Sequence, residues 1–96
     1  MPSSHTTVRT EKAQRYLAQL CKHFAHKVPV DWDQSSAHVR FDPGECRMEA
    51  DATSLRIHCE ADQEQKLQIV QYIVEDHVVR FGWREKLAVE WISGDA

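Results

Sequence analysis

Apolar residues recur at helical spacing in two segments of the chain. The first lies between Thr10, the expected N-cap, and the helix breaker Pro29, and its apolar positions form one buried stripe: Ala13, Leu17, Leu20, Cys21 and Phe24. The second begins at Asp62, which Gln65 complements in a capping-box pattern, and ends near Gly82. Its stripe comprises Leu67, Val70, Val74, Val78 and Phe81. We therefore expect two amphipathic helices.

Between these helices the pattern changes to strict alternation, which is typical of strands with one buried face. Four such stretches follow one another, separated by turn residues such as Asp42-Pro43-Gly44: 28–32, 37–41, 45–50 and 55–61. A register in which Ala50 faces Leu55 also places Glu49 opposite Arg56, so that apolar meets apolar and charge meets opposite charge. We therefore expect an antiparallel sheet with this register.

Two further strand-like stretches lie outside this region, at 5–10 and at 87–92. The expected order is strand, helix, four strands, helix, strand. Two helices and a sheet, each with one apolar face, bury these faces in two layers. We therefore predict an α+β, two-layer fold with an antiparallel sheet and both helices on one face. It forms a single domain over residues 1–96, with residues 1–4 and 93–96 as frayed tails.

Composition narrows the class of protein. The 96 residues are 42% hydrophobic and 28% charged, as in an ordinary globular domain, and carry a formal net charge of −3. This charge gives no reason to expect nucleic acid or an anionic membrane as a partner, and no apolar run is long enough to span a bilayer. The three widely spaced cysteines and the lack of a signal-peptide segment favour a cytoplasmic protein with reduced thiols.

Short runs of residues along the chain resemble a known family. The most specific is Cys21-Lys22-His23-Phe24-Ala25-His26-Lys27, and the others are Arg15-Tyr16-Leu17, Gly44-Glu45-Cys46, Asp76-His77, Arg80-Phe81, Arg84-Glu85 and Trp91. Together they resemble a bacterial family catalogued as domain of unknown function 2218, whose members look like small cytoplasmic proteins without an assigned activity. Similar domains are attached to siderophore-interacting flavin reductases, so the resemblance implies a link to iron handling by association only.

Polar stripes beside the two apolar faces form the first candidate site. The residues concerned are Tyr16, His23 and Lys27 on the first helix, with His77, Arg80 and, if the helix extends that far, Arg84 on the second. If the stripes face each other, they form a basic groove for a carboxylate or a phosphate. The alternative is structural, with the arginines paired to nearby carboxylates and the tyrosine packed at the rim.

The histidines of the two helices form a candidate metal site. His23 and His26 are three residues apart, and His77 would supply a third ligand if the helices lie side by side. Cys21 cannot join His23 on one ion, because a spacing of two residues puts them on opposite sides of a helix. The alternative is that these histidines are ordinary surface groups.

Other chemistries have less support. Cys46 and Cys59 are expected to face each other on the buried side of the sheet, where a thiol behaves as a small hydrophobe. The sequence contains no motif of serine hydrolases, phosphate-binding loops or zinc proteases. The polar face of the sheet mixes both signs of charge without aromatic residues, which is typical of a solvated surface.

The leading hypothesis is therefore a non-enzymatic binding module, without a cofactor, for a small anionic ligand or a protein partner in the groove beside the helices. Trp32, Trp83 or Trp91 would anchor a protein partner, and a homodimer through the last strand is an open alternative. The rival hypothesis is a metal- or iron/siderophore-linked accessory protein that uses His23 and other histidines of the helices. An enzyme is a third alternative.

Overall fold

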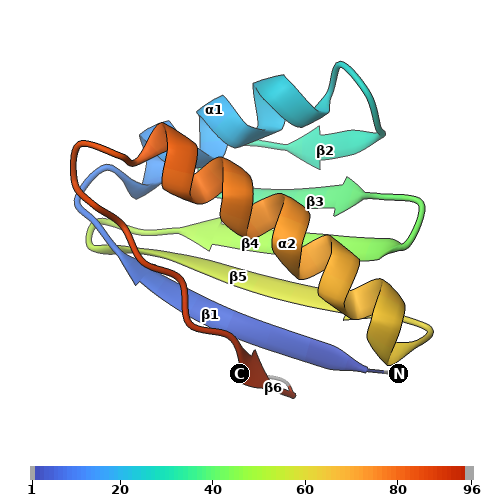
Figure 1. Ribbon diagram of the computed structural model, residues 1–96. Coiled ribbons are helices and arrows are strands. Elements are labelled where there is room, and N and C mark those ends of the chain that lie inside the picture. Colours follow the sequence, from blue (N-terminus) through green and yellow to red (C-terminus); the bar gives the residue numbers. More distant parts are fainter. Residues whose placement is uncertain (1, 95–96) are drawn as a thin grey trace.

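The computed structural model describes residues 2–94, which form one antiparallel sheet with two helices on one of its faces (Figure 1). The elements in chain order are β1 (Ser3–Arg9), α1 (Ala13–Phe24), β2 (Val30–Trp32), β3 (Ser36–Arg40), β4 (Gly44–Ala50), β5 (Ser54–Ala61), α2 (Glu64–Phe81) and β6 (Ile92–Ser93). Within the sheet the order is β2-β3-β4-β5-β1-β6, so β1 pairs with β5 after the meander. The predicted α+β class with both helices on one face is confirmed.

The core lies between the helices and the sheet. The predicted helix stripes are buried there together with the apolar side of the strands, except Phe81, which is partly buried. The largest fully buried side chains come from both layers and include Leu17, Leu20, Met48, Leu55, Ile57, Val70 and Val74. Each such side chain contributes about 1.5–3 kcal/mol through burial. Neither of the described helices is long and apolar enough to cross a membrane.

Strands β4 and β5 pair in the register predicted from the alternation. Ala50 lies opposite Leu55, and Cys46 lies opposite Cys59. This register is strongly determined, because a slip of one residue would move every apolar side chain to the solvent face. All three cysteines are free and buried, in agreement with the expectation of reduced thiols within the core.

Helix α1 begins later than predicted, at Ala13. Thr10 does not act as the helix N-cap; its hydroxyl accepts a hydrogen bond from the backbone N–H of Lys12 at 3.1 Å, in the turn before the helix. The same hydroxyl donates to Glu85 at 2.9 Å. The prediction of a cap at Thr10 is therefore wrong, because residues 11 and 12 form a turn and the helix N-cap is Lys12.

The capping box predicted for α2 is also wrong. The helix begins at Glu64, and its N-cap residue Gln63 makes no side-chain hydrogen bond to the helix N-terminus. The end of the helix agrees with the prediction, since α2 stops at Phe81 and Gly82 follows as the C-cap.

The last strand is shorter and later than predicted. Residues 87–91 form no strand, and only Ile92 and Ser93 pair with β1. The apolar residues of the expected strand pack partly buried against the core instead: Leu87, Val89 and Trp91. Trp91 Nε1 donates to the carboxylate of Glu75 on α2 at 3.0 Å. The alternation in this segment therefore reflects packing against α2 rather than pairing in the sheet.

The tails are shorter than expected. Strand β1 begins at Ser3, and the buried hydroxyl of Ser4 donates to Gln71 on α2. Of the expected C-terminal tail, Ser93 lies in β6 and the N–H of Gly94 donates to the carbonyl oxygen of Ser3 at 2.8 Å. Residues 95–96 lie outside the described part of the chain.

Candidate functional site

A cavity of about 380 Å³ lies between the C-terminal end of α1, the middle of α2 and the turn that joins β3 to β4. The end of α1 and this turn lie at the same end of the sheet (Figure 1). Its apolar walls are formed by Phe24, Val28, Phe41, Pro43 and Ile73. Its polar lining consists of His23, Lys27, Asp42 and His77. An apolar cavity of this size with a few polar groups is typical of a site for a small molecule.

His23 on α1 and His77 on α2 meet at this cavity. Their Nε2 atoms are 3.0 Å apart, and their ring centroids are separated by 4.6 Å. Nδ1 of His77 lies 2.6 Å from the carbonyl oxygen of Ile73, one turn earlier in α2, so we assign the proton of His77 to Nδ1. Nε2 of His77 then accepts a hydrogen bond from Nε2–H of His23. This contact does not use the other ring nitrogen of His23, Nδ1.

Aromatic rings hold the histidine pair in place. Phe24, which is only 4% exposed, packs edge-to-face against His77 at 4.9 Å and against Phe41 at 5.1 Å. On the other side, Phe81 packs edge-to-face against His23 at 5.8 Å. Such pairs contribute about 0.5–1.5 kcal/mol each beyond the area they bury. The exposed imidazole of His23 and the half-buried imidazole of His77 are therefore positioned by ring contacts at the edge of the core.

Positive charge gathers around His23. The pKa of His23 is lowered from its ordinary value, first by desolvation and then by repulsion from His77, Lys27, His26 and Arg80. His23 is thus mainly neutral at neutral pH. An anion bound beside it would offset this repulsion, so the electrostatic field at this end of the cavity favours an anionic group.

The structure brings three of the six predicted ligand-binding residues to this cavity: His23, Lys27 and His77. Arg80 lies just beyond the cavity lining and forms an ion pair with Asp76 at 3.1 Å. It is near enough to His23 to lower the pKa of that imidazole. Arg80 therefore adds to the positive field without lining the cavity.

Tyr16 belongs to a different contact. Its hydroxyl donates to the carboxylate of Glu85, in the turn that follows α2, and Thr10 donates to the other oxygen of the same carboxylate. Burial, followed by the contact with Glu85, raises the pKa of Tyr16 to about 12. The same bonds lower the pKa of Glu85, with Tyr16 as the largest cause. Tyr16 thus fastens the end of α2 to α1 and does not face the cavity.

Arg84 is not on the helical stripe predicted for it. Because α2 ends at Phe81, Arg84 lies in the following turn, where its guanidinium carbon is 5.3 Å from the centroid of the Trp83 ring. Of the tryptophans expected as anchors for a partner, Trp83 and Trp32 are 66% and 40% exposed. Trp91 is partly buried in the contact of the C-terminal segment with α2.

The three histidines predicted as a metal site are not assembled as a ligand set. His23 and His77 are in contact, whereas His26 lies in the turn that follows α1, which ends at Phe24. Over residues 2–94, no group of three or more His, Cys, Asp or Glu side chains is placed to hold a metal ion.

Sequence reasoning missed the part that the turn between β3 and β4 plays in the cavity. Phe41, Asp42 and Pro43 line it together with the two helices. The Asp-Pro-Gly signal correctly located a turn here, and Gly44 and Phe41 exchange two backbone hydrogen bonds across it. No local signal indicates that this turn reaches the helix layer, because that depends on where the helices lie over the sheet.

Comparison with known proteins gives two matches and one negative result. The family model described as "Uncharacterized protein conserved in bacteria (DUF2218)" matches residues 5–92. The NMR structure of PA4090 from Pseudomonas aeruginosa is 32% identical in sequence, over 96% of both chains, with a TM-score of 0.81. No curated protein matches the chain at a significant level.

Proposed function

We propose that this chain, which belongs to the DUF2218 family of uncharacterised bacterial proteins, is a binding module for a small amphipathic carboxylate. The ligand would lie in the cavity beside the helices. The apolar part of the ligand lies against Phe24 and Phe41, and the carboxylate lies near His23 and Lys27. The observation that carries this proposal is one cavity of about 380 Å³ that combines apolar walls with a histidine pair and a lysine.

The apolar walls favour an organic acid over a bare inorganic anion. A ring or short alkyl chain that buries about 100 Å² of apolar surface gains about 2.5 kcal/mol, at about 25 cal/mol per Å². Inorganic phosphate has no apolar surface and gains nothing from Phe24, Phe41 or Ile73. Most of the discrimination among anions is therefore expected to come from the walls of the cavity.

The charged groups orient the ligand. A carboxylate that accepts hydrogen bonds from Lys27 and His23 forms charge-assisted bonds, which are about twice as strong as neutral ones. The bound anion would raise the pKa of His23, because it offsets the repulsion that now lowers it. Asp42 also lines the cavity and opposes an anion; it is exposed, as are Lys27 and His23, so solvent screens all three charges. Ligand binding is therefore expected to take up a proton near neutral pH.

Isothermal titration calorimetry with benzoate, acetate and phosphate tests the proposal. Benzoate should bind at least about tenfold more tightly than acetate or phosphate, because only benzoate fills the apolar part of the cavity. Lys27→Ala should weaken benzoate binding, whereas Lys22→Ala, an exposed lysine of α1 outside the cavity lining, serves as the matched control. Equal affinity for benzoate and acetate, or full benzoate binding by the Lys27 variant, would refute the proposal.

The contact between His23 and His77 supports a second candidate, a metal-linked accessory function. In an octahedral site, where neighbouring ligands are at right angles, two nitrogen ligands at about 2.0–2.1 Å from the ion would lie about 2.9 Å apart, and the two Nε2 atoms are 3.0 Å apart. The hydrogen bond from His77 Nδ1 to the carbonyl oxygen of Ile73 is an arrangement common among metal-bound histidines. Further ligands would have to come from solvent or from a bound chelator such as a siderophore.

Elemental analysis of protein purified without a histidine tag or chelator separates the two candidates. A stoichiometric metal that is lost in His77→Ala and kept in Lys27→Ala would favour the metal-linked function. Metal-free protein that binds benzoate would favour the carboxylate site.

A further inference from the structure

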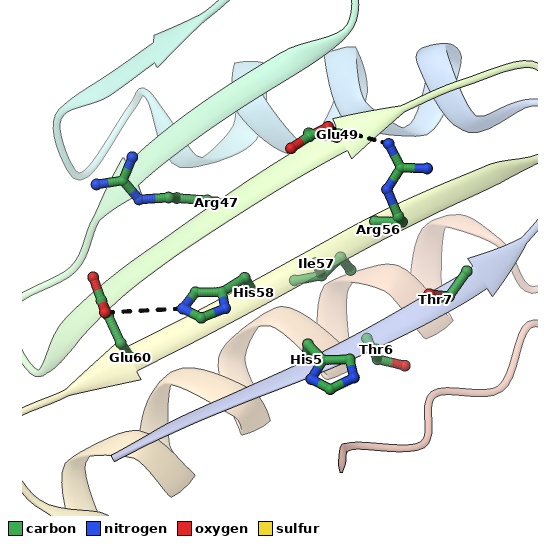
Figure 2. A pocket seen from close by; sticks show the side chains of 9 residues that line it. All are labelled: His5, Thr6, Thr7, Arg47, Glu49, Arg56, Ile57, His58 and Glu60. Atoms are coloured by element: carbon green, nitrogen blue, oxygen red, sulfur yellow. Dashed lines mark hydrogen bonds and ion pairs between the residues drawn. The ribbon is translucent and has the colours of Figure 1, made fainter. Parts of the chain in front are cut away.

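A row of histidines and one arginine crosses the open face of the sheet, on the side away from the helices. His5, His58, Arg47 and His38 are successive cross-strand partners on β1, β5, β4 and β3. Side chains in such positions have Cβ atoms about 4.5–5.5 Å apart. Figure 2 shows three of them, His5, His58 and Arg47, in front of the sheet with the helices behind it. A hollow of about 540 Å³ is lined by His5, His58 and Arg47, and a second hollow of about 410 Å³ is lined by Arg47 and His38.

Arg47 is the arginine of this row, and it is unpaired. In the described part of the chain, its guanidinium makes no hydrogen bond or ion pair. Two arginines on the neighbouring strands are neutralised, Arg40 by Asp31 at 2.8 Å and Arg56 by Glu49 at 3.1 Å and by Asp51 at 2.9 Å. Arg9 also lies on this face, at the end of β1 opposite Ser54 and outside the row. Arg47 is therefore the group of the row that is ready to receive an anion.

Each histidine next to Arg47 has a carboxylate of its own. Nε2 of His38 lies 3.4 Å from Glu45, and Nε2 of His58 lies 3.8 Å from Glu60, a pair that Figure 2 shows beside Arg47. Nε2 of His38 is buried and has no hydrogen-bond partner among the described residues. A proton on either imidazole would turn these contacts into charge-assisted pairs.

Protonation of these histidines reverses the charge around Arg47. With neutral imidazoles, the one positive charge of Arg47 stands beside the two negative charges of Glu45 and Glu60. Two added protons make the group net positive, and histidine is the side chain whose charge changes between pH 5 and 8.

The remaining groups around the row do not oppose this change. His5, across from His58, contacts the carbonyl oxygen of Gly94 through Nδ1 at 2.8 Å and adds further positive charge when protonated. Ile92 of β6, opposite His5, carries no charge. On β2, Asp31 faces His38 and is already paired with an arginine.

We propose that this face is a proton-gated site for a small tetrahedral dianion, a phosphoryl or sulfate group, bound by Arg47 together with His38 and His58. The planar fork of a guanidinium matches two oxygens of such a group. At neutral pH, Glu45 and Glu60 repel the dianion. At acidic pH, each carboxylate is engaged by its own protonated histidine, and Arg47 is free to bind. The site lies on the opposite face of the sheet from the carboxylate cavity and does not depend on it.

The test is an NMR titration of the ¹⁵N-labelled protein with sulfate at about pH 5.5 and about pH 7.5, with ionic strength held constant by chloride. Sulfate stays a dianion over this range, so any change in affinity belongs to the protein. Binding at the lower pH should be at least about fivefold tighter, since one added charge at about 4 Å in water changes an equilibrium by that factor. The shifts should centre on β3, β4 and β5.

Matched variants identify the groups responsible. Arg47→Gln should abolish the response to sulfate at both pH values, whereas Arg40→Gln, on the same face but already paired with Asp31, should keep it. The double variant Glu45→Gln with Glu60→Gln should bind sulfate near neutral pH about as well as the wild type does in acid, because the repelling charges are gone. Equal affinity at both pH values, unchanged binding by Arg47→Gln, or shifts confined to the helices would overturn the proposal.

Discussion

Replacing Gly44 by alanine tests how the turn between β3 and β4 is held against the helices. Gly44 opens β4 opposite Ala61 of β5, directly after the three turn residues that line the cavity. A Cβ at this position would lie 2.4 Å from the carbonyl oxygen of Glu60, 2.9 Å from Cβ of Ala61 and 3.1 Å from Cγ2 of Val70 on α2. The nearest of these atoms belongs to backbone that is paired in the sheet, so it cannot rotate away.

The expected cost follows from this crowding. The new methyl group must withdraw by about 1 Å from a backbone oxygen, and overpacking of this kind costs about 1–3 kcal/mol. We expect the free energy of unfolding to fall by about 2–3 kcal/mol. For a domain of this size that corresponds to a drop in Tm of about 8–24 °C. Benzoate binding should weaken as well, because Phe41 and Asp42 move with the turn.

Urea unfolding followed by circular dichroism measures the loss. Gly82→Ala is the matched control: its nearest contacts are side-chain carbons of Leu87, at 2.2 and 2.7 Å, and that side chain is partly exposed. The backbone of Gly82 has a φ of −98°, which alanine accepts without strain. Gly82→Ala should therefore lower the free energy of unfolding by at least about 1 kcal/mol less than Gly44→Ala does. If Gly44→Ala loses less than about 0.5 kcal/mol, the crowding argument is wrong.

Tyr16→Phe should lower the free energy of unfolding by about 1–2 kcal/mol in urea, because Glu85 loses its buried partner, whereas Tyr72→Phe, at a 71% exposed position, should change nothing measurable. The pKa of His23 is lower in the folded protein than its ordinary value of 6.5, so the unfolded chain binds that proton more readily. The free energy of unfolding should therefore be unaffected by this group above pH 6.5 and should decrease as the pH falls below 6.5. His23→Gln should make this decrease smaller. If the free energy of unfolding depends on pH in the same way in the variant and the wild type, the reasoning is wrong. Burial raises the pKa of Cys21 to about 11, and all three thiols are fully buried, so a thiol reagent should react with them only after unfolding; rapid labelling of the native protein would contradict the buried arrangement.

The parts of the fold that were predicted correctly are those set by local periodicity. The pairing of Ala50 with Leu55 followed from alternation and from charge pairing across a short turn, both of which act over a few residues. The predictions that failed depend on partners far away in the sequence. Thr10 lies in the turn before α1, where its hydroxyl donates to Glu85, and Trp91 is not in a strand but donates to Glu75 on α2.

By itself, the sequence determined the two-layer arrangement, the helices and the strand register, because the period of the apolar residues decides which side of each element is buried. Only the tertiary structure decided which polar groups meet. His23 lies on His77 rather than beside His26, and Tyr16 reaches Glu85 rather than the groove. The physical reason is that the shift and angle of each helix over the sheet depend on the joint packing of core side chains from both layers. No period within one element contains that information.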